Sequence, residues 1–493
     1  MSDELERQAA ACLLASFAGL EAPEWTRGWI ERGLGGIVLF AANVEDRAQV
    51  AALTGALRAE RPELVIAIDE EGGDVTRLEA ASGSSYPGNL ALGFVDDVEL
   101  TQAVAGAIAD DLVEAGVTLN LAPVADVNSN PRNPVIGVRS FGSEPELVAR
   151  HVAAFVAGTQ ERGVAACAKH FPGHGDTTVD SHLGLPVVEA ERGELLVGPA
   201  VPFRAAVEAG VGAIMTAHLV VPALDGVPAT VSRVIVGDLL RGDLGFDGVV
   251  ITDALDMRAV SETIGVEETA VRAVAAGADA LCLGPTIDEA GVESIHRALV
   301  SAVRSGRLRA ERLGEAAEAV TRLGRLAPAV GSDAGHVRGQ TPDMSTEAPD
   351  QEIGAVAARR AVLVRGDVAL DAPPLVVELE PQPMVAAGRA AFGLGKVISE
   401  RWPESRVVTL RDSSRDAGTV LQSADARPLV VVIRDARRHP WQQSVANELV
   451  AARPDAVVVE TGLPGWLPAS SASIATHGAG RVNLEAAADL LVP

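Results

Sequence analysis

The chain has 493 residues, of which 48% are hydrophobic and 22% charged, and its formal net charge is −26 at pH 7. A chain of this length is longer than a domain with a single hydrophobic core usually is, so at least two domains are predicted. The acidic balance argues against nucleic acid and against an anionic membrane as partners, because both select for a basic protein surface. The first residues, MSDELER, show no basic segment followed by an apolar run, so no secretory leader is expected and a cytoplasmic location is predicted.

Short apolar runs alternate with helix-length amphipathic segments through the first part of the chain. The runs cover residues 12–17, 36–40, 64–69, 118–123, 165–171, 213–219, 249–254 and 280–284. They are almost continuously apolar, which is typical of parallel strands covered on both faces. Eight such runs with intervening helices predict a (β/α)8 TIM barrel. A doubly wound open sheet is the alternative, although no GxGxxG motif follows the first run.

The rest of the chain predicts a second, smaller domain. Helical segments up to residue 326 are expected to complete a catalytic barrel domain of residues 1–326. Residues 327–350 are rich in Pro and Gly and lack periodicity, which predicts a linker. Residues 351–493 are predicted to form an α/β sandwich with a mostly parallel sheet. Its strands are expected near residues 361–364, 375–379, 406–410, 429–433 and 456–460.

Ionisable side chains gather where four of the predicted barrel strands end, namely Asp69, Lys169 with His170, His218, and Asp253. Packing does not explain them, because a buried charge without a partner is costly. The carboxyl ends of barrel strands meet at one mouth, so these groups are expected to share a pocket. Lys169 is one of only two lysines in the chain. All other cationic side chains are Arg, so this position is interpreted as one that requires a compact ammonium.

Two of these features indicate acid, base or nucleophile chemistry. Asp253, held at the end of a rigid strand, is a candidate nucleophile, and the alternative is that it caps the following helix. In Asp180-Ser181-His182, residues two apart in an extended loop point to the same side. The carboxylate can then orient the imidazole, which makes His182 a candidate general acid/base near neutral pH.

A metal site is the competing interpretation of the histidine-rich segment. His170, His174 and Asp176 offer suitable donor atoms, but an i, i+4 histidine pair binds zinc best on a helix. Pro172 and the neighbouring glycines would break a helix here. We therefore expect no metal ion at this segment.

These motifs closely resemble those of glycoside hydrolase family 3, in its bacterial β-N-acetylglucosaminidase branch. The resemblance rests on KHFPGHGDT (169–177), DSH (180–182) and ITDALDM (251–257). Further matches, in the same order along about residues 10–320, are DEEGG (69–73) with Arg77, NLAPVADV (120–127), RSFG (139–142), PATVS (228–232) and LGFDG (244–248). The chain departs from the family pattern at Glu70, where Gln is usual, and at Ala254, where a second Asp is frequent.

The resemblance implies a role for each matched residue. Asp253 would form a covalent glycosyl-enzyme, and His182, paired with Asp180, would be the general acid/base. The sugar would be bound by Asp69, Arg77, Arg139, Lys169, His170 and His218. The implied activity is that of a retaining exo-β-N-acetylglucosaminidase acting on muropeptide fragments or chitooligosaccharides, with no metal or organic cofactor. The second domain resembles the one attached in two-domain members.

Several alternatives remain open at this point. A neutral imidazole does not repel an incoming anion as a carboxylate would, so inorganic phosphate is a second candidate acceptor and the protein would then be a phosphorylase. A β-glucosidase of the same family is a rival that the DSH segment disfavours. A metallohydrolase and a non-enzymatic sugar-binding protein are the rivals from other classes. The sequence specifies no oligomeric state.

Overall fold

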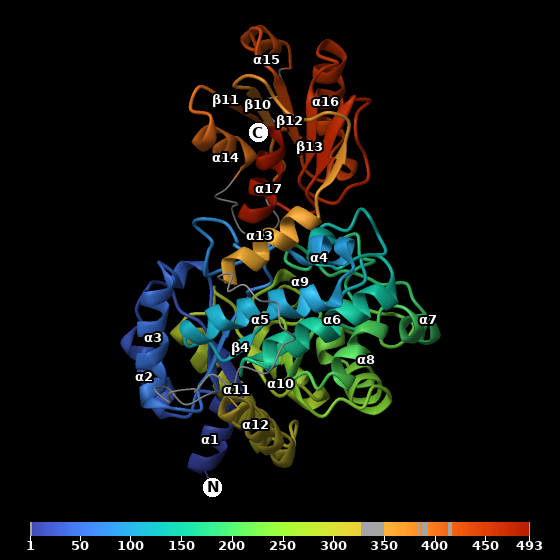
Figure 1. Ribbon diagram of the computed structural model, residues 1–493. Coiled ribbons are helices and arrows are strands. Elements are labelled where there is room, and N and C mark those ends of the chain that lie inside the picture. The colour runs from blue at the N-terminus through green and yellow to red at the C-terminus, as the bar shows by residue number, and fades with distance from the viewer. Residues whose placement is uncertain (1, 327–349, 383–384, 387–392, 413–416, 493) are drawn as a thin grey trace.

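The computed structural model describes residues 2–326, 350–382, 385–386, 393–412 and 417–492. A barrel occupies the lower part of Figure 1, and a separate sheet domain lies above it. The linker predicted for 327–350 falls outside the described residues except for residue 350, where α13 begins. The predicted domain boundaries therefore stay a prediction.

The first domain is a nearly closed barrel of eight parallel strands, in the order β7-β6-β5-β4-β3-β2-β1-β8. The two outer strands of this order, β7 and β8, are brought together by an isolated parallel bridge between Ile251 and Ala280. Each of the eight predicted apolar runs contains one strand, which confirms the predicted fold. The strands are β1 (Leu13–Ala15), β2 (Gly36–Leu39), β3 (Val65–Ile68), β4 (Leu119–Asn120), β5 (Ala165–Phe171), β6 (Ala213–Thr216), β7 (Val249–Thr252) and β8 (Leu281–Cys282).

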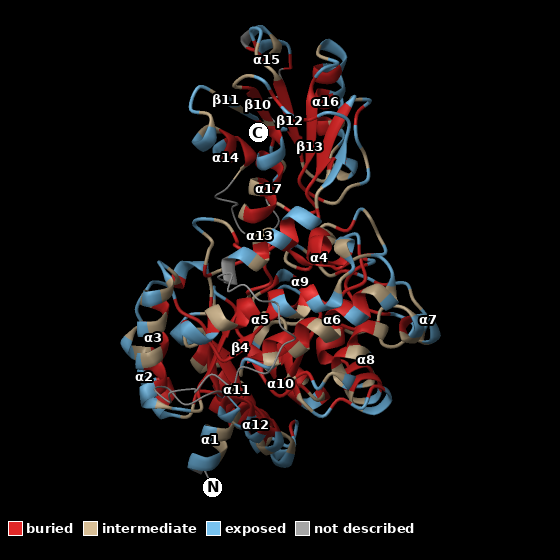
Figure 2. Ribbon diagram, in the orientation of Figure 1, coloured by how far each residue is buried: buried red, intermediate tan, exposed pale blue. Residues whose placement is uncertain are grey.

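The strands are buried on both faces because alternate side chains serve two cores. In β3, Val65 and Ala67 point into the barrel, and Ile66 and Ile68 pack against the surrounding helices. Figure 2 shows the result, with buried strands inside and exposed outer helix faces. At the amino-terminal end, α12 packs its Leu323 into the interior cluster. The opposite, carboxyl-terminal end is thereby left as the mouth.

The surrounding helices are amphipathic and begin at defined caps. In α11, for example, the Asp288 carboxylate accepts a hydrogen bond from Gly291 N at 3.0 Å, a cap worth about 1 kcal/mol. Ile295 and Leu299, four apart, are buried on the inner face. None of the helices in the described ranges is both long and apolar enough to cross a membrane.

The helices of the barrel domain are α1 (Ser2–Ala11), α2 (Glu24–Glu31), α3 (Arg47–Glu60), α4 (Asn89–Val95), α5 (Val98–Glu114), α6 (Pro145–Gln160), α7 (Arg192–Val197), α8 (Val201–Glu208), the π-helix η4 (Val234–Asp243), α9 (Arg258–Ser261), α10 (Val266–Ala276), α11 (Glu289–Arg304) and α12 (Ala310–Arg325). Short 3-10 turns add η1 (Ala41–Asn43), η2 (Gly137–Arg139) and η3 (Ala229–Val231).

The second domain has a six-stranded sheet in the order β11-β10-β12-β13-β14-β9. The first five strands are parallel, and β9 pairs with β14 antiparallel. Helices α15 and α16 pack on one face, and α14 and α17 on the other. The strands are β9 (Leu363–Arg365), β10 (Leu375–Leu379), β11 (Arg406–Leu410), β12 (Leu429–Ile433), β13 (Val457–Glu460) and β14 (Ala472–Ala475).

This arrangement is the predicted α/β sandwich with one strand more than expected. The sequence reading missed β14, whose small residues, ASIA, give a weak apolar signal. The parallel strands follow the doubly wound order 2-1-3-4-5, in which ligands usually bind beyond the strand carboxyl ends. The helices are α13 (Asp350–Arg360), α14 (Leu394–Arg401), α15 (Ala417–Ser423), the 3-10 turn η5 (Ala436–Arg438), α16 (Pro440–Ala452) and α17 (Arg481–Leu491).

The two domains meet through the carboxyl edge of the second sheet. Arg434, directly after β12, forms an ion pair with Asp74 of the barrel, whose side chain is 3% exposed. The other Asp74 oxygen accepts a hydrogen bond from Ala479 N at 2.8 Å. Helix α13 lies between the two domains in Figure 1. The second domain therefore covers one side of the barrel mouth.

Candidate active site

A cavity of about 340 Å³ opens at the barrel mouth. Its size falls within the range of small-molecule pockets. Its base is formed by interior side chains of the barrel, including Leu121, Met215 and Cys282. Its polar wall consists of Asp69, Glu71, Arg77, Arg139, Lys169, His170, His174, Ser181, His182, Asp253 and Asp256. Seven of the nine predicted site residues thus line one cavity, whereas Asp180 and His218 do not line it.

Asp253 follows β7 directly, so the strand fixes its backbone. Its N–H donates to Thr216 O at 3.1 Å, and its Oδ1 accepts from Ala254 N at 2.8 Å. Burial tends to raise its pKa, whereas the imidazoles of His170, His218 and His182 lower it, so that the net pKa lies below that of an ordinary aspartate. The carboxylate is therefore ionised at neutral pH, as a nucleophile requires.

His182 and Asp180 form the predicted dyad. His182 Nδ1 lies 2.7 Å from Asp180 Oδ1, which also accepts a hydrogen bond from His182 N at 2.9 Å. Burial tends to lower the pKa of His182, but the hydrogen bond to Asp180 and the charge of Asp253 raise it above the ordinary histidine value. Because Nδ1 is engaged, Nε2 is the nitrogen left to exchange a proton with a bound molecule.

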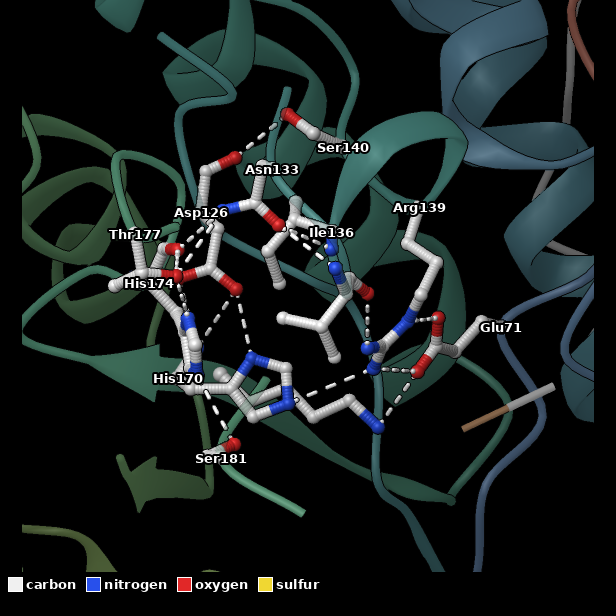
Figure 3. A network of polar contacts seen from close by, with 12 residues as sticks. Glu71, Asp126, Asn133, Ile136, Arg139, Ser140, His170, His174, Thr177 and Ser181 are labelled. Atoms are coloured by element: carbon white, nitrogen blue, oxygen red, sulfur yellow. Dashed lines mark hydrogen bonds and ion pairs between the residues drawn. The ribbon is translucent and has the colours of Figure 1, made fainter. Parts of the chain in front are cut away.

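Lys169 is the centre of a buried network of charges. Its side chain is only 2% exposed, and Nζ lies 2.7 Å from Asp69 Oδ1 and 2.8 Å from Glu71 Oε1. Arg139 binds Glu71 in a bidentate manner, at 3.0 and 2.8 Å (Figure 3). Two cations therefore offset two carboxylates, which reduces the cost of burying all four.

Glu71 was not among the predicted site residues, although it lies in the DEEGG motif after β3. Burial tends to raise its pKa, but Arg139 and Lys169 lower it to about 2. It is therefore a permanent anion that holds both cations at the cavity wall. The signal that could have revealed it is its position two residues after Asp69 at a strand end.

Asp126 is the second residue that the sequence reading missed. It is fully buried, and its Oδ2 lies 2.7 Å from His170 Nδ1 (Figure 3). On the other side of the ring, His170 Nε2 lies 3.5 Å from Arg139 Nη2. A guanidinium can only donate, so Nε2 accepts and Nδ1 bears the hydrogen. Asp126 thus fixes the orientation of the His170 ring, and its only sequence signal was the NLAPVADV motif.

Arg77 connects the cavity to the second domain. Its Nη2 lies 3.4 Å from Asp69 Oδ2 and donates to the backbone oxygen of Ala386 at 3.0 Å. Its Nε is buried and has no hydrogen-bond partner among the described residues. Val385 and Ala386 also line the cavity. The second domain therefore contributes part of the cavity wall, which no sequence motif indicates.

His218 lies behind Asp253 and does not line the cavity. It is fully buried, with Nε2 3.0 Å from Ala254 O and Nδ1 2.7 Å from Thr230 Oγ1. Burial lowers its pKa. Its contacts are those of a residue that supports the Asp253 backbone, whereas the family resemblance had implied sugar binding.

The two histidines among the candidate metal ligands of the sequence analysis are engaged in other contacts. His170 contacts Asp126 and Arg139, and His174 contacts Thr177 and Ser181. Across the described ranges, no three His, Cys, Asp or Glu residues are grouped so that they could hold a metal ion.

Comparison with known proteins identifies the family. The model of the "Glycosyl hydrolase family 3 N terminal domain" matches residues 21–323. The chain therefore belongs to glycosyl hydrolase family 3, which confirms the resemblance found in its motifs.

Two relatives and one solved structure are similar to this chain. It is 38% identical over 317 residues to beta-hexosaminidase A of Pseudoalteromonas piscicida, covering 59% of this chain and 53% of the relative. It is 39% identical over 256 residues to a beta-hexosaminidase of Alkalilimnicola ehrlichii, covering 51% of this chain and 73% of the relative. The chain thus spans about half the length of the first relative. The structure of a family 3 beta-N-acetylglucosaminidase from Paenibacillus sp. str. FPU-7 is similar with a TM-score of 0.87 and 35% identity, covering 99% of this chain and 96% of that one.

Proposed function

We propose that the protein is a retaining exo-β-N-acetylglucosaminidase that releases N-acetylglucosamine from muropeptide fragments or chitooligosaccharides. One observation carries the proposal: an ionised carboxylate, Asp253, and an aspartate-oriented imidazole, His182, line the same cavity. Retaining glycosidases need a nucleophile and a proton donor beside one anomeric carbon. The names of the relatives support an N-acetylhexosamine as the sugar.

The reaction takes two displacement steps. In the first, Asp253 attacks the anomeric carbon while His182 Nε2–H protonates the departing glycosidic oxygen. In the second, neutral His182 takes a proton from water, whose oxygen attacks the anomeric carbon and frees Asp253. Two inversions at one carbon give net retention of configuration.

The charged wall of the cavity supplies the sugar contacts. Asp69, Lys169 and Arg77 offer acceptors and donors for hydroxyl groups, and Arg139 and His170 stand beside them. Their mutual hydrogen bonds orient these groups before a sugar arrives, which lowers the cost of binding. A cavity closed at its base by the barrel interior favours removal of one terminal sugar over cleavage within a chain.

Two aryl glycosides that differ only at C2 test this proposal. We expect turnover of 4-nitrophenyl N-acetyl-β-glucosaminide to exceed that of 4-nitrophenyl β-glucoside at equal concentration. Asp253→Asn should reduce turnover by at least about a thousandfold. A preference for the glucoside would instead support a β-glucosidase, and an active Asp253→Asn variant would overturn the nucleophile assignment.

Inorganic phosphate is a second candidate acceptor for the glycosyl-enzyme. The favouring observation is that an imidazole takes the place of a carboxylic acid, with the Arg77 guanidinium lining the same cavity. Phosphate attack in place of water would release N-acetylglucosamine 1-phosphate. Phosphorus NMR of reactions run in phosphate buffer tests this, and free sugar as the sole product would exclude it.

A further inference from the structure

The segment that carries the dyad is tied to the barrel at its middle residue, Ser181. Ser181 is 2% exposed, and its Oγ lies 3.0 Å from His174 Nε2 (Figure 3). Its backbone oxygen accepts from Ala259 N at 3.4 Å. Both contacts fall between Asp180 and His182. The position of the dyad therefore depends on how Ser181 is held.

The direction of the His174 contact follows from its surroundings. Thr177 Oγ1 donates its hydrogen to His174 O at 3.0 Å. Its 2.7 Å contact with His174 Nδ1 must then have the ring nitrogen as donor. His174 Nε2 is consequently the acceptor for the Ser181 hydroxyl. Burial lowers the pKa of His174 to about 4, so the acceptor persists at neutral pH.

His174 itself is held by the wall that contacts the sugar site. Its N–H donates to Asp126 Oδ1 at 2.6 Å, and the other Asp126 oxygen orients His170. Its backbone oxygen accepts from Asn133 Nδ2 at 2.8 Å. Figure 3 shows these residues as one connected set, which reaches Arg139 at its other end. The ring of His174, 1% exposed, is thus fixed relative to the cavity.

We propose that His174 is a positioning residue, which, through its hydrogen bond to Ser181, holds His182 where it can protonate the leaving oxygen above Asp253. The proposal rests on the acid/base function proposed for His182. His174 borders the cavity, but in this scheme it acts through Ser181 and not on the reacting atoms. Its effect should therefore follow the need for leaving-group protonation.

Ser181→Ala is the first test, since it removes one hydroxyl and little volume. The two substrates are 2,4-dinitrophenyl N-acetyl-β-glucosaminide, whose leaving group needs little protonation, and N,N′-diacetylchitobiose, whose leaving group needs it. General acid catalysis raises the rate about a hundredfold or more. We therefore expect the loss of positioning to lower kcat/KM on chitobiose about tenfold. The loss on the dinitrophenyl substrate should be smaller than about twofold. Ser181→Thr, which keeps the hydroxyl, should restore chitobiose cleavage.

The matched control is Ser16→Ala, another buried serine after a barrel strand, whose Oγ donates to Gly284 O at 2.6 Å. It should affect both substrates equally. The double variant Ser181→Ala with His174→Gln should be no slower than the slower single variant, because both remove one interaction. Equal losses on both substrates for Ser181→Ala, or no loss, would overturn the positioning role. If His182→Ala also fails to discriminate the substrates, the acid/base assignment fails instead.

Discussion

The carboxylate of Asp180 accepts two hydrogen bonds from His182, one from the ring Nδ1 at 2.7 Å and one from the backbone N–H at 2.9 Å. Ring and backbone of the proposed acid are thus held by one oxygen. The pKa of His182 is raised, and that of Asp180 is lowered by the same contact although burial opposes it. The pairing stabilises the imidazolium form of His182, which is the form that the proposed acid role requires.

This pairing predicts the pH dependence of kcat/KM. Activity should fall at acid pH as Asp253 is protonated, below the ordinary aspartate range, because its pKa is lowered. Activity should fall at alkaline pH as His182 loses its proton, above the ordinary histidine range. Asp180→Asn removes the anion that raises the pKa of His182, so the alkaline limb should move to lower pH. An unmoved limb in rate profiles of this variant would contradict the dyad.

Removal of the proposed acid should be selective for the leaving group. His182→Ala should lower kcat/KM on N,N′-diacetylchitobiose by about a hundredfold or more. Dinitrophenyl glycosides depart without protonation and should lose far less in the first step. Their deglycosylation should become slow, which a burst of dinitrophenol in stopped-flow measurements would reveal. Equal losses on both substrates would argue that His182 only binds the sugar.

Disruption of the contact between the domains should affect both stability and substrate binding. Asp74 is buried against Arg434 and Ala479, and it lies in the loop that carries Glu71 and Arg77. Arg434→Ala leaves Asp74 without its cation, which should lower the free energy of unfolding by about 2 kcal/mol. This loss is smaller than that expected for a fully buried ion pair, because Arg434 is partly exposed. KM should rise as the loop loosens.

The control for this prediction is Arg360→Ala, which breaks a more exposed pair with Asp97 across the same two domains. Such pairs contribute about 0–1 kcal/mol. Thermal unfolding and initial rates would measure both variants side by side. Identical behaviour of the two would show that the Asp74 contact has no special role.

The burial of Glu70 predicts an unusual dependence of the unfolding free energy on pH. It is 4% exposed, its Oε2 accepts from Arg77 N and Leu78 N, and burial raises its pKa to about 7. The folded state therefore binds a proton more tightly than the unfolded chain between the ordinary glutamate pKa and about 7. Across this window its contribution to stability falls as pH rises, by up to about 3 kcal/mol.

Glu70→Gln should remove this contribution, because an amide oxygen can accept the same hydrogen bonds without ionising. Urea unfolding at pH 5 and pH 8 would compare the two proteins. We expect the parent to lose about 2 kcal/mol more than the variant between these values. Parallel losses in the two proteins would show that Glu70 stays ionised in the folded state.

The fold was predictable because each strand of the barrel lies within a short apolar run of the sequence. The residues that line the cavity were predictable where they end those runs, as Asp69, Lys169 and Asp253 do. The DSH spacing also predicted the contact between Asp180 and His182, since an Asp two residues from a His can reach it locally. Each of these signals is local, because it lies within a short stretch of sequence of its own.

The remaining features depend on contacts between distant segments. Glu71 and Asp126 matter through partners such as Arg139 and His170, which neither periodicity nor spacing reveals. His218 ends a strand like the others, but Thr230 and the backbone of Ala254 occupy its ring nitrogens and hold it out of the cavity. Ala386 reaches the cavity only because the second domain docks where it does.

That docking limits how far the barrel can be treated as an interchangeable module. A barrel joined to a different second domain would retain Asp253 and the contact between Asp180 and His182, since both are anchored within its own chain segments. It would lose the contacts that Arg434 and Ala479 make with Asp74. The loop that carries Glu71 and Arg77 would then lose this support. Exchange of the second domain should therefore alter the proposed sugar recognition and leave the proposed displacement chemistry intact.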